Sequence, residues 1–117
     1  MYAQHRLRES AAFERTRRRG RSWSTALLAL SAVPNDLDVT RCGFVVSRRV
    51  GNAVVRNRVR RRLREIARRL LGTLPVGWDL MLSARPAAAA AAYGELEGAA
   101  QELLGRARLL VETPEAQ

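Results

Sequence analysis

The chain has 117 residues, of which 47% are hydrophobic and 27% are charged, and its formal net charge is +10 at pH 7. The length fits a single domain, and the hydrophobic fraction excludes the class of disordered chains, which combine high charge with low hydrophobicity. No apolar run approaches the ~20 residues that a membrane-spanning helix needs, and no apolar stretch follows the charged N-terminus as it would in a secretory signal.

These properties predict a basic, cytoplasmic domain over residues 1–117 that has no membrane partner and no evident obligate protein partner. Its core is expected to run from about residue 6 to about residue 110, followed by a loose tail at 111–117. The single cysteine, Cys42, and the single histidine, His5, exclude an internal disulfide and a multi-cysteine zinc site. Cys42 is expected to be a buried strand residue in a reducing environment.

The positive charge is concentrated in the first part of the chain. All 21 basic residues are arginines, and residues 1–69 hold 18 of them but only 5 of the 11 acidic residues. A GC-rich coding bias explains the choice of arginine over lysine, but it does not explain the clustering. A one-sided basic surface is typical of proteins that bind nucleic acid.

Three elements are predicted before residue 48. Ser10 can cap a short basic helix that ends at Arg19, with Gly20 closing it in a left-handed conformation. The arginines of its last turn suit either the negative end of the helix dipole or an anionic ligand. The apolar runs 25–33 and 42–47 flank a Pro-Asn-Asp turn, which predicts two neighbouring antiparallel strands.

The strongest helical pattern lies between Asn52, a good N-cap, and Gly72, a good residue to end a helix. Four apolar residues recur there at helical spacing, and we expect this stripe to face the core: Val59, Leu63, Ile66 and Leu70. The arginines fall on its two flanks, one with Arg56, Arg60, Arg61, Arg64 and Arg68, the other with Arg58, Arg62 and Arg69.

Residues 43–70 contain ten arginines and one acid, Glu65. Like charges at this spacing repel each other, and a solvated helix usually mixes in acidic residues. Guanidinium groups, by contrast, bind pairs of phosphate oxygens in a fixed fork. The helix is therefore predicted to present a nucleic-acid-binding face.

The rest of the chain predicts a strand at Trp78–Ser83 and a last helix that begins in the alanine run 87–92. The exposed acids of this helix indicate a packing role, and its buried face is expected to carry Leu96, Ala99, Leu103 and Ala107. No nucleophile, base and acid are grouped in the sequence, so no catalytic residue and no metal-ligating residue is predicted in this chain.

The segment Arg48–Glu65, RRVGNAVVRNRVRRRLRE, closely resembles the signature of bacterial ribonuclease P protein subunits, whose Arg-Asn-Arg triplet falls here on Arg56, Asn57 and Arg58. The resemblance extends from about Arg6 to Leu110 and includes RLRESAAFERTRRRG, GFVVSRR and SARPA. It implies an α/β (α+β) two-layer sandwich of order α-β-β-β-α-β-α, with about four strands. It also implies a left-handed βαβ crossover, against the usual right-handed rule.

The family's function is also implied by this resemblance. Such a protein component binds the catalytic RNA subunit and the 5′ leader of precursor tRNA, and it supports Mg²⁺-dependent endonucleolytic removal of the leader in tRNA processing. The resemblance further implies that the RNA subunit of this ribonucleoprotein, rather than the protein, carries the active site and the Mg²⁺ ions.

The resemblance assigns two groups of binding residues. The expected contacts with the catalytic RNA are Arg48, Arg49, Asn52, Arg56, Asn57, Arg58, Arg60, Arg61, Arg64 and Arg68. Asn57 has an alternative, because its side chain could bond the first turn of its own helix. The leader is expected in a cleft between the first helix and the sheet, where Phe13 would stack on a base or pack in the core, and where Arg17 and Leu30 replace family aromatics.

Two other classes of protein are compatible with the basic helix. A general RNA-binding or ribosome-associated module of the same α/β shape would need the arginines but not the particular Arg-Asn-Arg opening. A self-sufficient nuclease would cleave RNA without any RNA subunit.

Overall fold

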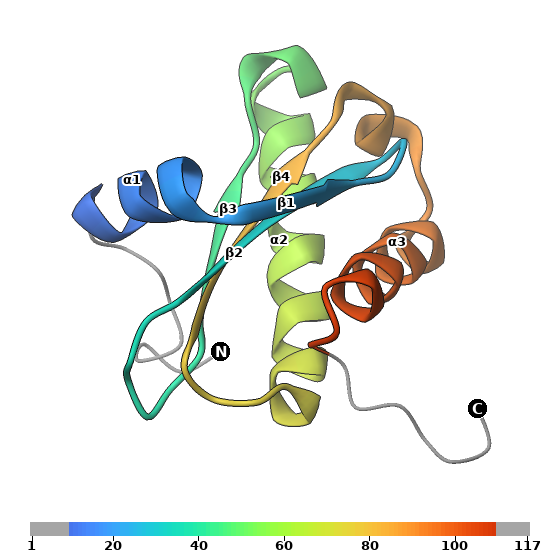
Figure 1. The fold of residues 1–117 in the computed structure, drawn as a ribbon. Helices are drawn as coiled ribbons and strands as arrows, with labels where there is room; N and C mark the ends of the chain where they lie inside the picture. Colours follow the sequence, from blue (N-terminus) through green and yellow to red (C-terminus); the bar gives the residue numbers. More distant parts are fainter. Residues whose placement is uncertain (1–9, 110–117) are drawn as a thin grey trace, which may run out of the picture.

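The computed structural model describes residues 10–109, and it describes the side chains of residues 14–70 and 72–109. The chain forms three helices and four strands in the order α-β-β-β-α-β-α that the resemblance implies (Figure 1). These are α1 (Ser10–Arg19), β1 (Arg21–Ser24), β2 (Leu28–Pro34), β3 (Arg41–Val45), α2 (Ala53–Leu70), β4 (Trp78–Ala84) and α3 (Tyr93–Arg106). Short 3-10 helices lie between them: η2 (Arg48–Val50), η3 (Leu71–Thr73) and η4 (Pro86–Ala90). The predicted tail, residues 111–117, lies outside the described range.

The four strands form one mixed sheet in the order β1-β2-β4-β3. Strand β4 pairs antiparallel with β2 and parallel with β3, so it lies between them. The prediction that the second and third strands of the chain are neighbours was therefore wrong. Strand β1 was also missed by the residue pattern, because its four residues are too few to show a clear alternation.

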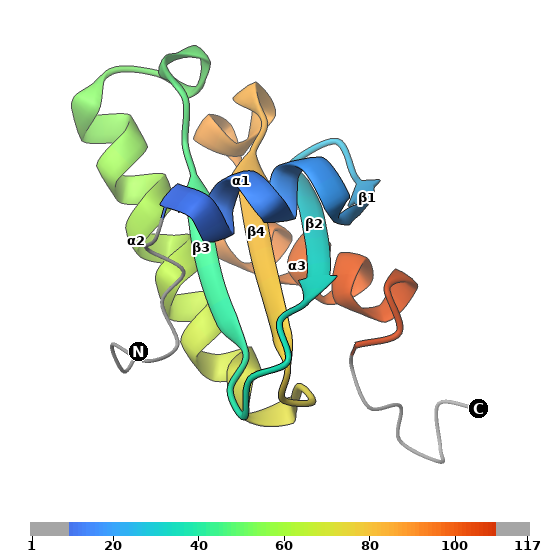
Figure 2. The ribbon, with the colours of Figure 1, turned by 60° about the vertical axis from the view of Figure 1, so that its left-hand side comes forward.

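The chain passes from β3 to the parallel strand β4 through α2. In Figure 2 the sheet lies in front of α2, both strands run upward, and β4 stands to the right of β3. This arrangement is a left-handed crossover, opposite to the usual hand of such units. It confirms the handedness implied by the resemblance.

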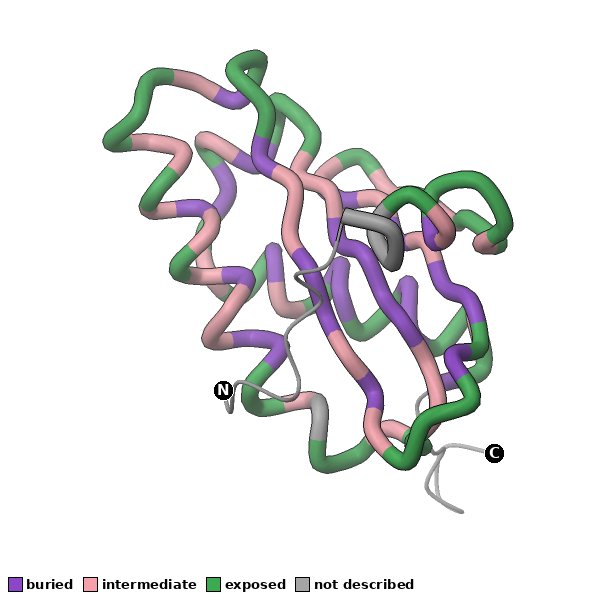
Figure 3. Tube along the Cα trace, turned by 90° about the vertical axis from the view of Figure 1, so that its left-hand side faces the viewer, coloured by how far each residue is buried: buried purple, intermediate pink, exposed green. Residues whose placement is uncertain are grey.

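The core lies between the sheet and the layer formed by α2 and α3, while α1 crosses the opposite face (Figure 2). Figure 3 shows buried residues along the strands and on one side of α2. The stripe predicted on α2 is confirmed, because Val59, Leu63 and Ile66 are fully buried and Leu70 is partly buried against them. Cys42 is buried in β3 as predicted, and its burial raises the pKa of the thiol to about 12.

The two ends of α2 differ in how well they were predicted. At the start, the Asn52 Oδ1 atom accepts the Val55 N–H at 3.0 Å, which confirms the N-cap. At the end, Gly72 does not adopt a left-handed conformation, because the chain continues into the 3-10 helix η3. There the Thr73 hydroxyl donates to the Leu70 carbonyl at 2.7 Å, so a glycine cap is not needed to satisfy that oxygen.

The alanine run does not begin the last α-helix. Residues Pro86–Ala90 form η4, and the chain is extended at Ala92 before α3 starts at Tyr93. Glu95 accepts the Ala92 N–H at 2.8 Å and so fixes the true start of the helix. The predicted buried face of this last helix is confirmed, since Leu96, Ala99 and Leu103 are buried and Ala107, just after the helix, is partly buried. Between residues 10 and 109, no helix combines the length and the apolar character required to cross a membrane.

Gly20 ends α1 for a different reason from the one predicted. Its φ angle is not positive, so no left-handed cap is formed. A Cβ atom on Gly20 would instead lie 2.3 Å from the Thr16 carbonyl oxygen and 3.1 Å from the Ala32 carbonyl oxygen. Glycine is needed because the chain turns from α1 into β1 directly against β2.

We expect Gly20→Ala to lower the free energy of unfolding by roughly 1–3 kcal/mol, because the new methyl group must displace backbone atoms. Gly98→Ala is the matched control: Gly98 lies inside α3, where an added methyl group would meet no neighbouring segment within 4 Å. That change is expected to stabilise the protein by roughly 0.5–1 kcal/mol. Urea unfolding of both variants measures the contrast, and equal effects would contradict the close approach at Gly20.

Candidate nucleic-acid interface

The arginines of α2 lie on two flanks of its buried stripe, and the two flanks differ in what they contact. We call the side facing η4 and α3 the closed flank; it carries Arg58, Arg62 and Arg69. We call the other side the open flank; it carries Arg56, Arg60, Arg61 and Arg64. The open flank lies away from α3, because α3 packs beside the closed flank.

Each arginine of the closed flank binds another part of the protein. Arg58 Nη2 donates to the Ala89 carbonyl at 3.1 Å, and Arg62 Nη1 donates to the Ala91 carbonyl at 3.1 Å. Arg69 Nη1 lies 3.0 Å from Glu97 Oε2 on α3. These side chains therefore fasten α2 to the segment that follows β4.

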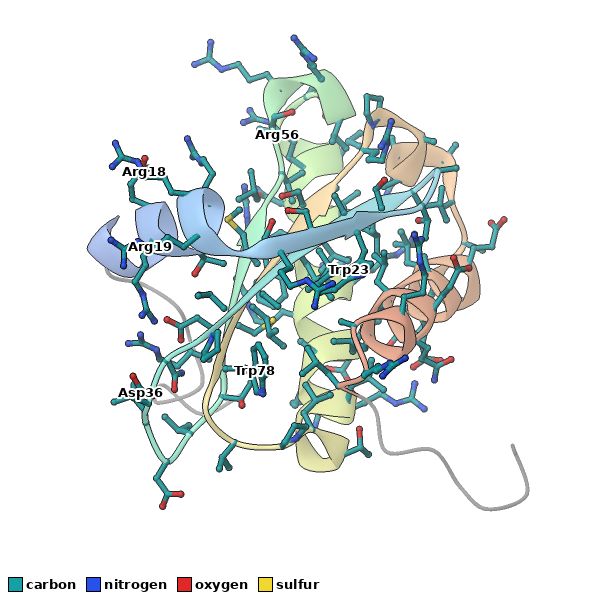
Figure 4. All side chains as sticks on the ribbon, in the orientation of Figure 1. Arg18, Arg19, Trp23, Asp36, Arg56 and Trp78 are labelled. Carbon is teal, nitrogen blue, oxygen red and sulfur yellow. The ribbon has the colours of Figure 1, made fainter. Side chains whose placement is uncertain are left out.

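The open flank has no such partners. Among the described residues, Arg56, Arg61 and Arg64 form no ion pair, and Arg60 Nη1 donates only to the neutral Asn57 Oδ1 at 2.9 Å. Figure 4 shows Arg56 on the first turn of α2. Four positive charges on one side of a helix, none of them in an ion pair with a described residue, produce a local positive potential that attracts a polyanion.

Asn57 and Asn52 were both predicted as RNA contacts, and their side chains have different partners in the structure. Asn57 is exposed and bonds Arg60, so the alternative that it caps its own helix was wrong. Asn52 holds the cap instead. Both residues lie near the start of α2, and the side-chain oxygen of each already accepts a hydrogen bond within the protein.

Arg68 is the fifth arginine predicted on the same side, but it is paired. It forms an ion pair with Glu65, one turn earlier, and both side chains are about half exposed. The hydrogen bond from Arg68 lowers the pKa of the Glu65 carboxyl. Because the pair neutralises the local charge, Arg68 contributes less to the positive potential than the open flank does.

Two further arginines extend the basic surface before α2. Arg48 and Arg49 are exposed on η2, while the next residue, Val50, is buried and anchors the turn. Gly51 has φ of 154°, and a Cβ there would lie 3.0 Å from the Val55 side chain. The turn between η2 and α2 is thus closely packed, which holds the two arginines next to the start of α2.

A buried carboxylate that the sequence did not single out lies under α1. Asp79, on β4, is fully buried and accepts hydrogen bonds from Arg41 Nε at 2.9 Å and Arg41 Nη2 at 2.8 Å. Asn35 Nδ2 donates to it at 2.8 Å, and Arg15 of α1 reaches it at 3.4 Å. Burial alone would raise the pKa of Asp79, but the hydrogen bonds and the charge of Arg41 lower it below the usual value.

This cluster connects α1 to the sheet. Arg15 also donates to the Pro34 carbonyl at 3.0 Å, at the end of β2. Its guanidinium therefore bridges two strands and fixes how α1 crosses them. The other arginines of this helix point outward, as Figure 4 shows for Arg18 and Arg19.

Of the three residues predicted to contact a leader, the two whose side chains the structure describes, Arg17 and Leu30, do not come together. Phe13 belongs to α1, but its side chain lies outside the described part of the structure. Arg17 is exposed on α1. Leu30 is fully buried between β2 and the α2–α3 layer, beside Cys42 and Ile66, so its assignment was wrong.

The assignment of Leu30 overlooked the alternation of side chains along β2, which places successive residues on opposite faces of the sheet. Leu28, Leu30 and Ala32 face the core, so Ala29 and Ser31 face the side that α1 crosses. Ser31 pairs with Ser22 of β1, and their hydroxyl oxygens are 3.1 Å apart. The alternation of Leu28, Leu30 and Ala32 with Ala29 and Ser31 was the sequence signal that could have placed Leu30 in the core.

The described residues contain no group of three or more His, Cys, Asp or Glu side chains that could hold a metal ion.

Comparison with known proteins identifies the family. A family model described as Ribonuclease P matches residues 1–108. The ribonuclease P protein component of Roseiflexus castenholzii is 47% identical over 104 residues, which cover 88% of this chain and 85% of that protein. The component from Dehalococcoides mccartyi is 38% identical over 111 residues, covering 95% of this chain and 91% of that protein.

Solved structures give the same result. The RNase P protein of Staphylococcus aureus superposes with a TM-score of 0.84 at 25% identity, covering 92% of this chain and 98% of that one. A mutant of it described as defective in mRNA degradation activity has a TM-score of 0.85 at 26% identity, covering 92% and 91%. The Thermotoga maritima protein, in complex with 1-(4-fluorophenyl)-2-thiourea, has a TM-score of 0.79 at 30% identity, covering 86% and 98%. Sequence, fold and the basic surface agree, and the chain belongs to the ribonuclease P protein family.

Proposed function

We propose that this subunit of ribonuclease P binds the catalytic RNA through the open flank of α2, together with Arg48 and Arg49 of η2. The observation that carries the proposal is the contrast between the two flanks. The closed flank is engaged by the protein, whereas the open flank holds four guanidinium groups without an acidic partner among the described residues. Such groups are available to bridge phosphates, which position a protein on RNA.

The second RNA in this proposal is precursor tRNA, with its 5′ leader on the face of the sheet that α1 crosses. The resemblance assigns the leader to a cleft beside the first helix, and that face lies opposite the packed core. Arg17 is exposed there on α1, and the strands supply the hydroxyls of Ser22 and Ser31. Hydroxyls and guanidinium groups can bind the sugar-phosphate backbone without reading the base sequence.

The protein's role in the reaction is electrostatic. Catalytic RNA and precursor tRNA repel each other, and arginines that contact their phosphates reduce this repulsion and displace condensed counterions. The proposed site of hydrolysis is the RNA subunit, where bound Mg²⁺ supplies the chemistry. The proposed compartment is the cytoplasm.

The test is a cleavage assay on precursor tRNA with three samples: the protein alone, the RNA subunit alone, and both together. We expect no cleavage by the protein alone, and we expect the protein to lower the Mg²⁺ and salt concentrations at which the RNA subunit cleaves. The proposal is wrong if the protein changes neither requirement. Cleavage by the protein alone would indicate a self-sufficient nuclease.

The description of the S. aureus relative adds one sample to this assay. An mRNA incubated with the protein alone tests whether this chain shares the mRNA degradation activity named for that protein. We expect the mRNA to remain intact, because no catalytic group of side chains is visible in the sequence.

A further inference from the structure

The 3-10 helix η4 lies between the closed flank of α2 and the turn η2. Arg58 and Arg62 donate to carbonyls at its end and just after it, at Ala89 and Ala91. On its other side η4 packs against η2, and both are anchored by buried side chains, Ala88 at 0% and Val50 at 5% exposure. Figure 1 shows these two short helices side by side near the start of α2.

The carbonyls at the end of a helix lack partners within it, and in a packed position they need donors from elsewhere. Alanine side chains are small enough for a guanidinium to reach the backbone between them. Arg58 and Arg62 supply the donors at successive turns of α2. The conformation of η4 therefore depends on these two arginines.

Arg58 already uses part of the guanidinium that would bind phosphate. A guanidinium binds two phosphate oxygens either with Nε and Nη2 or with its two Nη groups. In Arg58 the Nη2 donates to Ala89, and the Nε is buried with no hydrogen-bond partner among the described residues. The buried Nε closes the first fork, and the bond to Ala89 takes one of the two Nη2 hydrogens, so Arg58 has fewer donors left for phosphate than Arg56 has. Arg56 also has a buried Nε, but its two Nη groups form no hydrogen bond with a described residue.

We propose that Arg58, the second arginine of the Arg-Asn-Arg triplet, is a positioning residue rather than an RNA contact. With Arg62 it holds η4, η4 supports η2, and η2 presents Arg48 and Arg49 to the RNA. This inference rests on the proposed function for its last step. The contact between Arg58, η4 and η2 does not depend on that step and can be tested in the free protein.

The first experiment is amide hydrogen exchange of the free protein. Arg58→Ala is expected to speed exchange of the η2 and η4 amides by about tenfold, the effect of losing one hydrogen bond. The probes are Val50, Gly51, Ala88 and Ala91, whose amides bond within these turns. Arg61→Ala, on the open flank, is the matched control and should leave these amides unchanged. Unchanged exchange in Arg58→Ala overturns the proposal.

The second experiment is a double-mutant cycle on affinity for the catalytic RNA. Arg58→Ala is expected to weaken binding about fivefold in the wild-type background, comparable to losing one phosphate contact. In the Arg48→Ala, Arg49→Ala background it should have no further effect, because the groups that it positions are gone. If Arg58 only stabilised the domain as a whole, Arg58→Ala would weaken binding equally in both backgrounds. A direct phosphate contact would also do so, while lowering the salt dependence by about one unit in each.

Arg62→Ala provides an independent variant if Arg58→Ala folds poorly. Arg62 lies outside the triplet but supports the same turn. Arg62→Ala should therefore also speed exchange of these amides, and it should not weaken RNA binding further in the Arg48→Ala, Arg49→Ala background. If Arg48→Ala, Arg49→Ala alone leaves RNA affinity unchanged, the proposed RNA contact at η2 fails, while the exchange result still decides the positioning of η2. Additive effects of Arg58 and Arg62 with Arg48 and Arg49 overturn the inference.

Discussion

Replacing all four arginines of the open flank, Arg56, Arg60, Arg61 and Arg64, by alanine is expected to weaken binding of the catalytic RNA by on the order of 10²–10³-fold at physiological salt. The reason is that each guanidinium that neutralises a phosphate releases condensed counterions. The slope of log affinity against log salt should therefore fall by about three units in the quadruple variant and by about one unit in Arg56→Ala or Arg61→Ala.

The measurement is a salt titration of binding to the RNA subunit, with urea unfolding to verify that each variant is folded. Arg108→Gly is the matched control for a single charge. Arg108 is exposed outside the basic surface, and its φ of 61° suits glycine, so the change removes a charge without straining the backbone. An affinity loss in the quadruple variant that is the same at every salt concentration would argue against phosphate contacts by the open flank.

Asp79→Ala is expected to lower the free energy of unfolding by about 3–5 kcal/mol, the range for removing one partner of a buried ion pair. The loss leaves Arg41, Arg15 and Asn35 without the acceptor that holds them. Since small domains are stable by only about 5–15 kcal/mol, this is a large share of the total. Arg18→Ala breaks the exposed pair with Glu14 and is the control, with an expected loss below about 1 kcal/mol.

The stability supplied by Asp79 is also expected to depend on pH. Its pKa is lower in the folded protein than in the unfolded chain, where it is near ~3.9. The contribution is therefore complete above the unfolded pKa and is lost as the pH falls through the folded pKa. Asp79→Asn removes the charge at every pH. The difference in unfolding free energy between the wild type and Asp79→Asn should shrink below about pH 4, and a constant difference would show that the carboxylate does not titrate with folding.

The features that were predicted correctly depend on neighbouring residues in the sequence. The buried stripe of α2, its cap at Asn52 and the face of α3 all follow from spacing within one helix. The helical period also separated the arginines into two flanks before any contact was known. The order of elements and the left-handed crossover came from the resemblance, because no local pattern encodes the hand of a connection.

The features that were missed depend on contacts between distant segments. Pairing of β4 between β2 and β3, and the burial of Asp79 beside Arg41 and Arg15, join residues far apart in the chain. Gly20 is required by the approach of β2, which its own neighbours do not reveal. Likewise, the helical wheel gave Arg58 its flank but could not show that the alanine turn on that side needs its hydrogen bond.

One of the two inner strands of the sheet, β4, is also the last strand to be synthesised. Strands β2 and β3 each pair with β4, so the sheet is completed only when residues 78–84 have left the ribosome. The arginine-rich helix α2 is made earlier, and the layer beside it is complete only when α3 ends at Arg106. At typical rates of synthesis this interval lasts roughly 2–7 seconds. For that time a strongly cationic segment exists without its complete core, and any RNA that bound it then would do so before the domain closes.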